Sequence, residues 1–160
     1  MHNKEMINTF KDKIEISKKL KERAIYEGFT MAGIASIPGS SRLNLRTNAL
    51  ERWLSNNHHG EMKWMEAERR KNISLLLEGA RSVLSVGYSY LNSQSNNKDK
   101  FFKVGKFGQG EDYHKVISRK LKNIGRWINL EIPDCKWKIC VDTSPLLEKA
   151  WAEESGLGWI

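Results

Sequence analysis

The chain has 160 residues, of which 39% are hydrophobic and 29% are charged, and its formal net charge is +8. This composition is typical of one globular domain with its own core, and it excludes a disulfide-stapled secreted scaffold. No apolar run approaches the roughly 20 residues that a membrane span needs, and the first twenty residues are too charged for a secretory signal. We therefore expect a cytoplasmic protein without membrane contact.

The first half of the chain predicts two helices around one strand. Residues 5–27 carry apolar residues at a roughly helical spacing among lysines and glutamates, which predicts an amphipathic helix that Gly28 closes. The small and β-branched residues of 29–37 predict a short strand. A second helix is predicted at 49–55, where leucine and tryptophan share one face.

The second half predicts a strand, a loop and a long helix. Residues 80–91 alternate and are rich in Val, Tyr and Ser, which predicts a strand. The polar and glycine-containing residues 92–110 predict a flexible loop, and their glycines do not form a dinucleotide-binding fingerprint. A long helix is predicted from Glu111 to about residue 131, with Asp112 in its first turn.

The C-terminal residues predict a strand, an acid and a helix. Residues 136–141 are expected to form a strand that ends at Asp142, and a helix is expected to begin at about Pro145 and to end at Gly156. This order of elements predicts the α/β (α+β) class, with one mixed sheet and helices packed on it. In open α/β sheets, ligands bind at the carboxyl ends of strands, where Asp142 is expected to lie.

Metal and disulfide chemistry find little support in the residues themselves. The two cysteines, Cys135 and Cys140, are too few for an iron–sulfur cluster, and their spacing differs from the C-x-x-C of redox and zinc sites. Both are predicted to be structural thiols. The adjacent His58 and His59 lack a third ligand. No metal site is predicted.

Positive charge is concentrated between Lys98 and Arg126, where nine Lys or Arg residues face three acids. A field of this kind favours a polyanionic partner such as nucleic acid. The same charges are equally compatible with the solvated face of a helix in a basic protein. Charge alone leaves both interpretations open.

Two places in the sequence could support chemistry. An acid bordered by apolar residues, such as Asp142, can have its pKa raised by desolvation and act as a proton donor. The alternative for Asp142, which these residues alone favour, is an Asx turn or a helix cap. Asp112, Tyr113 and His114 at a helix start could bind a polar ligand, and capping with packing is the equal alternative.

Five sequence blocks follow one another between residue 50 and the last residue, and together they resemble a known family. They are Leu50–Met65 with a G-x-M-x-[YW]-M pattern, Leu75–Val83 (LLxPGARSV), Phe107–Lys115 (YAxGRDYHK), Asp142–Glu148 (D-[ST]-x-P-[VL]-[LV]-E) and Gly156–Ile160 (GLGWIG). Their order and spacing resemble the N-terminal, cobalamin-binding part of the epoxyqueuosine reductases, which are related to reductive dehalogenases.

The resemblance implies a function for the complete protein. Such an enzyme reduces the epoxide of epoxyqueuosine to queuosine at the wobble position of a tRNA anticodon, using cobalamin and electrons from two [4Fe–4S] clusters. By the family pattern, Asp142 is the general acid that protonates the substrate. The resemblance also implies the residues that line the cobalamin and substrate cavity, which are Asp112, Tyr113, His114, Thr143, Ser144, Gly156, Leu157, Gly158 and Trp159.

The resemblance also implies a domain organisation. Residues 1–160 are expected to form the N-terminal cobalamin- and substrate-binding domain, ending before the ferredoxin-like domain that carries the cluster cysteines. This part is expected to be monomeric and, by itself, inactive. Two departures from the family pattern change polar groups near the expected site, because Phe107 stands for a Tyr and Glu111 for an Arg.

One alternative function belongs to a different class. A stand-alone basic α/β module could bind RNA through residues 98–126 and perform no chemistry. A relative that carries out another cobalamin-dependent reduction, such as dehalogenation, is a weaker alternative, because the Asp112–His114 and Gly156–Ile160 blocks argue against it.

Overall fold

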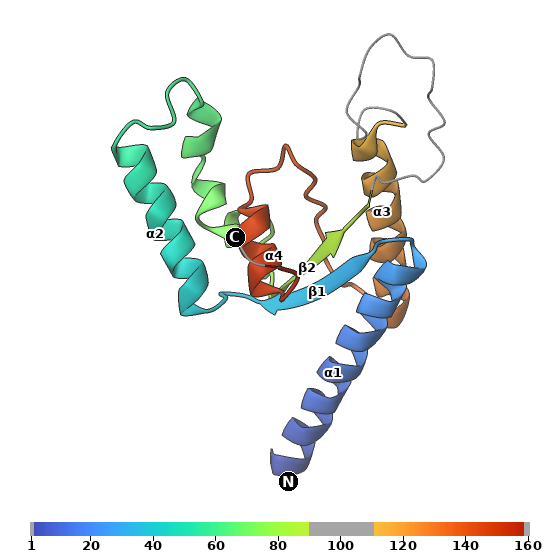
Figure 1. The fold of residues 1–160 in the computed structure, drawn as a ribbon. Coiled ribbons are helices and arrows are strands. Elements are labelled where there is room, and N and C mark those ends of the chain that lie inside the picture. The colour runs from blue at the N-terminus through green and yellow to red at the C-terminus, as the bar shows by residue number, and fades with distance from the viewer. Residues whose placement is uncertain (1, 90–110, 159–160) are drawn as a thin grey trace.

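The computed structural model describes residues 2–89 and 111–158, in which helices lie on both sides of a pair of strands (Figure 1). No helix within these ranges is both long and apolar enough to cross a membrane. The elements in chain order are α1 (His2–Tyr26), β1 (Met31–Ser36), α2 (Ser41–Ser55), the 3-10 turns η1 (Lys63–Glu66), η2 (Glu68–Arg70) and η3 (Ile73–Leu75), β2 (Ser82–Gly87), α3 (Tyr113–Glu131) and α4 (Glu148–Glu154).

The strands β1 and β2 pair in antiparallel fashion, and each strand contributes side chains to two apolar clusters. Side chains alternate between the two faces of a sheet, so residues that lie opposite one another share a face. Ala32 and its partner Val86 pack in one cluster, and Ala35 and its partner Val83 pack in the other. The strand pair is therefore covered on both faces.

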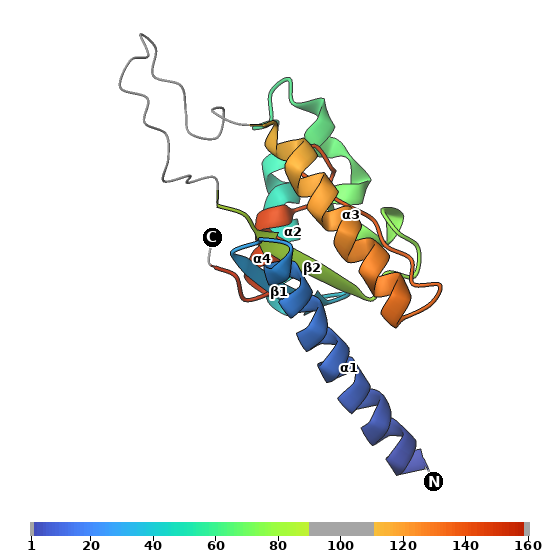
Figure 2. The same cartoon turned by 90° about the vertical axis from the view of Figure 1, so that its right-hand side faces the viewer.

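Helices α1 and α3 cover the first face (Figure 2). Ala24, Phe29 and Ile124 are the buried residues of this cluster, and Phe29 is only 2% exposed. Within the predicted apolar stripe of the first helix, Leu20 packs against this cluster, whereas Ile14 and Ile25 are exposed. Ile14 is 56% exposed, because the earlier turns of α1 extend away from the rest of the molecule (Figures 1 and 2).

Helices α2 and α4 cover the second face, where Leu43, Ala150 and Trp151 are buried with Ala35. Polar contacts fix the two helices to each other as well. The N-cap residue of α2, Ser40, donates both its backbone N–H and its hydroxyl to the Glu154 carboxylate, at 2.6 and 2.7 Å. These contacts hold the short α4 against the sheet.

Glycine ends two of the helices in the manner the sequence predicts. Gly28 follows α1 with φ of +89° and Gly156 follows α4 with φ of +76°, values that favour glycine. At the end of α4, the Leu157 N–H donates to the Ala152 carbonyl at 2.9 Å, and the Gly156 N–H donates to the Glu153 carbonyl at 3.0 Å. This pair of bonds defines a Schellman motif.

The α/β class is confirmed, whereas the sheet and the C-terminal elements differ from the prediction. The sheet formed by the described residues is an antiparallel pair and not a mixed sheet. Residues 136–141 make no strand ladder, and α4 begins at Glu148 rather than near Pro145. The second helix begins at Ser41, eight residues earlier than predicted, because Ser40 supplies an N-cap.

Substituting Gly33 by Ala is expected to destabilise the fold by about 1–3 kcal/mol. A Cβ at this position of β1 would lie 2.2 Å from the Ser155 carbonyl oxygen, so α4 would have to move. Chemical denaturation measures this loss. Gly158→Ala is the matched control, because a Cβ there would meet no heavy atom of residues 2–89 and 111–158 within 4 Å. Equal stability of the two variants would contradict the expected clash.

Candidate functional site

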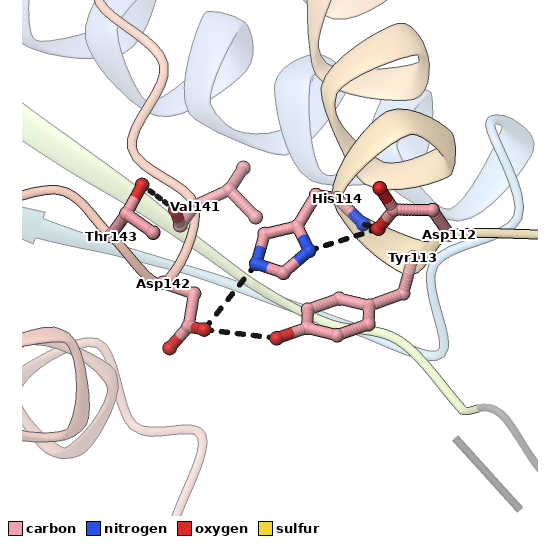
Figure 3. Close-up of polar contacts among 6 residues, drawn as sticks. All are labelled: Asp112, Tyr113, His114, Val141, Asp142 and Thr143. Atoms are coloured by element: carbon pink, nitrogen blue, oxygen red, sulfur yellow. Dashed lines mark hydrogen bonds and ion pairs between the residues drawn. The ribbon is translucent and has the colours of Figure 1, made fainter. Parts of the chain in front are cut away.

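The candidate site combines the first residues of α3 with the turn that carries Asp142 (Figure 3). Asp112 is the N-cap of α3, and its carboxylate accepts the backbone N–H of His114 at 3.0 Å. This cap fixes where the helix begins, and therefore where Tyr113 and His114 point. The capping alternative for Asp112 is thus confirmed, and the side chains that it positions meet Asp142.

Two donors converge on one oxygen of Asp142. The Tyr113 hydroxyl donates to Asp142 Oδ2 at 2.9 Å, and His114 Nε2 lies 3.4 Å from the same oxygen (Figure 3). The two rings stack, with centroids 4.0 Å apart and planes inclined by 27°. A phenol and an imidazole are therefore held together against one carboxylate.

His114 joins the two carboxylates of the site. Its Nδ1 lies 2.9 Å from Asp112 Oδ1, and its Nε2 faces Asp142. The side chains of His114 and Asp142 are 39% and 62% exposed. A ligand from solvent can therefore reach the three groups, and a proton can be shared along the line from Asp112 through His114 to Asp142.

Each titratable partner alters the pKa of its neighbour. The hydrogen bond with the Asp112 carboxylate raises the pKa of His114 above its ordinary value of 6.5, and a weaker bond to Asp142 acts in the same direction. The same contact lowers the pKa of Asp112. The hydrogen bond to the Asp142 carboxylate raises the pKa of Tyr113, so the phenol stays protonated as a donor.

Asp142 lies in a turn, and the prediction that it ends a strand is wrong. Its φ of +50° is left-handed, a conformation that Asp tolerates better than most residues. The Thr143 N–H donates to the Val141 carbonyl at 2.6 Å across this turn. This turn is made by the backbone, and it directs the carboxylate towards Tyr113 and His114.

Trp137 explains why residues 136–141, which precede Asp142, form no strand. Its ring lies over Gly125 of α3, where a Cβ would come within 2.5 Å of the ring, and its Nε1 donates to Asn129 Oδ1 at 3.0 Å. Residues 136–141 are thus docked on a helix instead of a neighbouring strand. This docking places the Asp142 turn beside the beginning of α3.

The remaining predicted site residues do not all join the cluster. The Thr143 hydroxyl donates to the Val141 carbonyl at 3.4 Å, within its own turn, and Ser144 hydrogen-bonds Cys140. Leu157 packs near Gly33 of β1. Among the described residues, no hydrogen bond or ion pair links Gly156, Leu157 or Gly158 to Asp142, and Trp159 lies outside the described residues.

Sequence reasoning missed Glu148 as a site residue. Burial raises the pKa of Glu148, and the negative charge of Asp142 nearby acts in the same direction. Glu148 is the first residue of α4, six positions after Asp142 in the same block. The available signal was an acid in the first turn of the predicted helix. Such an acid is ordinarily explained by its favourable interaction with the helix dipole, so it did not stand out.

The His114 imidazole is expected to titrate above 6.5 in the folded chain, and Asp112→Asn is expected to lower that midpoint. Asn caps helices as well as Asp does, so α3 should keep its start. Because the folded pKa is raised, this contact stabilises the fold at low pH, and the contribution is lost as the pH rises through the folded value. Nuclear magnetic resonance of the imidazole carbons gives the midpoint.

Asp12→Asn, an exposed substitution on α1, is the control for this titration. A midpoint that moves equally in both variants would reflect net charge and would contradict the pairing of His114 with Asp112.

The fold matches solved structures of epoxyqueuosine reductase. The enzyme from Streptococcus thermophilus superposes with a TM-score of 0.73 at 23% identity, covering 91% of this chain and 40% of that chain. A selenomethionine-labelled epoxyqueuosine reductase gives a TM-score of 0.74 at 22% identity, with the same coverage. The chain therefore has the α/β fold of one part of these reductases.

Sequence comparison then gives the family. The family model "Epoxyqueuosine reductase QueG, DUF1730" matches residues 70–143. Epoxyqueuosine reductase from Prochlorococcus marinus (strain NATL2A) is 49% identical over 151 residues, and that from Synechococcus sp. (strain CC9605) is 53% identical over 145 residues. These matches cover 94% and 91% of this chain, but 48% and 45% of the relatives. The chain is a homologue of the epoxyqueuosine reductases and spans about half their length, in the N-terminal part.

Proposed function

We propose that this chain is the cobalamin- and substrate-binding part of an epoxyqueuosine reductase, in which Asp142 is the general acid. The convergence of Tyr113 and His114 on the Asp142 carboxylate, in a homologue of these reductases, supports the proposal most directly. Breaking a C–O bond of an epoxide leaves negative charge on the oxygen, and a proton must reach it. A positioned carboxylic acid supplies such a proton.

The residues around Asp142 suit a large polar cofactor. Cobalamin presents a wide corrin ring with many amide groups, so its site must be open and rich in hydrogen-bonding groups. Asp142 is 62% exposed, and no heavy atom of the described residues stands within 4 Å of the position where a Cβ of Gly158 would lie. Tyr113, His114 and the turn at Thr143 would hold the cofactor, with the backbone of residues 156–158. Cobalamin, when bound, supplies the reducing chemistry.

The protein's own residues would supply and orient the proton. Asp142 would pass a proton from His114 to the substrate oxygen, while the Tyr113 hydroxyl fixes the rotation of the carboxyl group. His114, whose pKa is raised, replaces the proton after transfer, and Asp112 holds the imidazole ring in position. The two [4Fe–4S] clusters would be held outside these 160 residues, because this sequence has only two cysteines.

The substrate would be the wobble nucleotide of a tRNA anticodon stem-loop. The net charge of +8 favours such a polyanion. A stand-alone RNA-binding module is the second candidate, and the basic surface of α3 favours it. The two functions differ in their need for cobalamin, so a cofactor titration separates them.

The test is a titration of the purified chain with hydroxocobalamin, followed by the visible absorbance of the corrin. We expect a saturable spectral change that weakens several-fold in Tyr113→Phe, which removes only one hydroxyl group. Tyr26→Phe is the matched control, because Tyr26 is 80% exposed on α1. RNA binding without any cobalamin response would reject the proposed function and support the RNA-binding module.

A further inference from the structure

Helix α3 carries an unusual distribution of charge. Between the N-cap Asp112 and Glu131 its sequence contains no acidic residue but five basic ones. Helix α1 differs, since Lys18 and Lys19 are paired there with Glu22 and Glu15. Between Asp112 and Glu131, α3 therefore offers its cations no acidic side chain to pair with, whereas α1 mixes acids and bases along its length.

Four of the five cations share one exposed face. Lys115, Arg119, Lys122 and Arg126 are spaced by four, three and four residues, which places them in a row along the helix. The fifth cation, Lys120, points the other way and donates to the Glu27 backbone carbonyl beneath the Tyr88 ring. We call the four exposed cations the α3 stripe. Figure 2 shows α3 on the outside of the molecule.

The α3 stripe lines a shallow hollow of about 430 Å³, together with His114 and Ser118. Arg119 contacts Glu111 at 3.2 and 3.3 Å, and this exposed ion pair is open to competition. Among the described residues, Lys115, Lys122 and Arg126 form no ion pair. Three to four positive charges are thus available to a ligand along one side of the helix.

The α3 stripe begins at the candidate site. His114 lies both in the lining of the hollow and within 3.4 Å of Asp142 Oδ2. From Lys115 to Arg126 the helix rises about 16 Å at 1.5 Å per residue, a length that spans several nucleotides. A linear polyanion lying along this row would therefore bring one end of itself to Asp142.

We propose that the α3 stripe binds the phosphate backbone of the RNA strand whose modified nucleotide reaches Asp142. This inference rests on the proposed function for its choice of RNA, and on the row of cations for the location. Lys and Arg neutralise phosphates, and Arg can donate two parallel hydrogen bonds to one of them. The contacts give affinity and direction along the strand, while the groups around Asp142 select the nucleotide.

The experiment measures binding of a fluorescein-labelled anticodon stem-loop RNA to the 160-residue chain by fluorescence anisotropy, between 50 and 200 mM salt. One variant replaces the four residues of the α3 stripe by Gln, which has a similar helix propensity. The matched control replaces four exposed cations elsewhere by Gln, namely Lys13, Lys21, Arg52 and Lys63. Both variants lose the same charge, and circular dichroism checks that both remain folded.

We expect the stripe variant to bind RNA at least about tenfold more weakly. The slope of log affinity against log salt concentration should become smaller by about 2–3, because each phosphate contact on a single strand contributes about 0.7 to it. The control variant should keep most of the affinity and slope. Lys122→Glu serves as a single-site check with the same direction of effect. Equal losses in the stripe and control variants would overturn the proposal, since net charge would then explain binding.

Two further measurements make the proposal separable from others. A poly-glutamate peptide is expected to bind less tightly than the RNA if the proposal holds. Tight binding of this peptide that disappears in the stripe variant would overturn the proposal in favour of an acidic protein partner. Asp12→Asn, an exposed substitution on α1 away from the stripe, should leave RNA binding unchanged. Because the cobalamin titration and the RNA titration have separate readouts, failure of the proposed function and failure of this inference are distinguishable.

Discussion

Asp142→Asn is expected to lower the turnover of a reductase containing this chain by about 10²- to 10⁴-fold, the usual contribution of a general acid. Asn preserves the shape of the side chain and tolerates the left-handed φ of +50° at this position. The Tyr113 hydroxyl can still donate to the amide oxygen, so the turn should remain in place. What is lost is the transferable proton.

The measurement needs a complete enzyme. We would join this chain to the C-terminal part of the Prochlorococcus marinus relative, to which it is 49% identical, and follow conversion of epoxyqueuosine in a stem-loop RNA by mass spectrometry. Turnover should fall while the cobalamin spectrum of the chain remains that of the unsubstituted protein. A fall in cofactor affinity instead would assign Asp142 to binding.

Asp134→Asn is the matched control for this prediction. Asp134 is also an exposed acid with a left-handed backbone, at φ of +63°, but it lies in the loop that follows α3. The control should retain full turnover. Unchanged turnover in Asp142→Asn would show that another group delivers the proton, and Glu148, whose pKa is raised by burial, would then be the next candidate.

Trp151→Ala is expected to lower the free energy of unfolding by about 3–5 kcal/mol. Trp151 is only 4% exposed and packs with Ala35, Leu43 and Ala150 between α4 and the sheet. A helix of seven residues is unstable without such packing. The loss is a large share of the 5–15 kcal/mol that usually stabilises a domain.

Urea denaturation gives this change directly, with Trp64→Ala as the control. Trp64 is 60% exposed, and the Arg70 guanidinium carbon lies 4.7 Å from the centroid of its ring. A cation–π interaction of this kind is worth about 0.5–1 kcal/mol at an exposed site. A small loss in Trp64→Ala and a large one in Trp151→Ala would confirm the second apolar cluster. Similar losses in the two variants would contradict it.

Local sequence signals were sufficient wherever the structure depends on neighbouring residues. Gly28 and Gly156 ended their helices as predicted, because the left-handed cap needs a residue without a Cβ. Asp112 was predicted in the first turn of its helix. It is the N-cap, directly before the first helical residue, Tyr113. The candidate site was found in the same way, since Tyr113 and His114 follow that cap directly.

Tertiary packing decided what the local signals could not. The apolar residues of 136–141 suit a strand, but a strand needs a partner, and Trp137 docks this segment on Gly125 of α3. The polar and proline residues before Glu148 suit a helix start, yet they form the turn that carries Asp142. Periodicity records which residues are apolar and does not say which surface will cover them.

The sequence by itself therefore determined the α/β class, the family resemblance and the residues of the candidate site. Only the tertiary structure decided that Tyr113 and His114 converge on one oxygen of Asp142, and that four cations of α3 form one row leading to it. The first kind of property depends on contacts within a few residues. The second depends on the chain folding back through a docked tryptophan, since His114 and Tyr113 are 28 and 29 positions from Asp142 in the sequence.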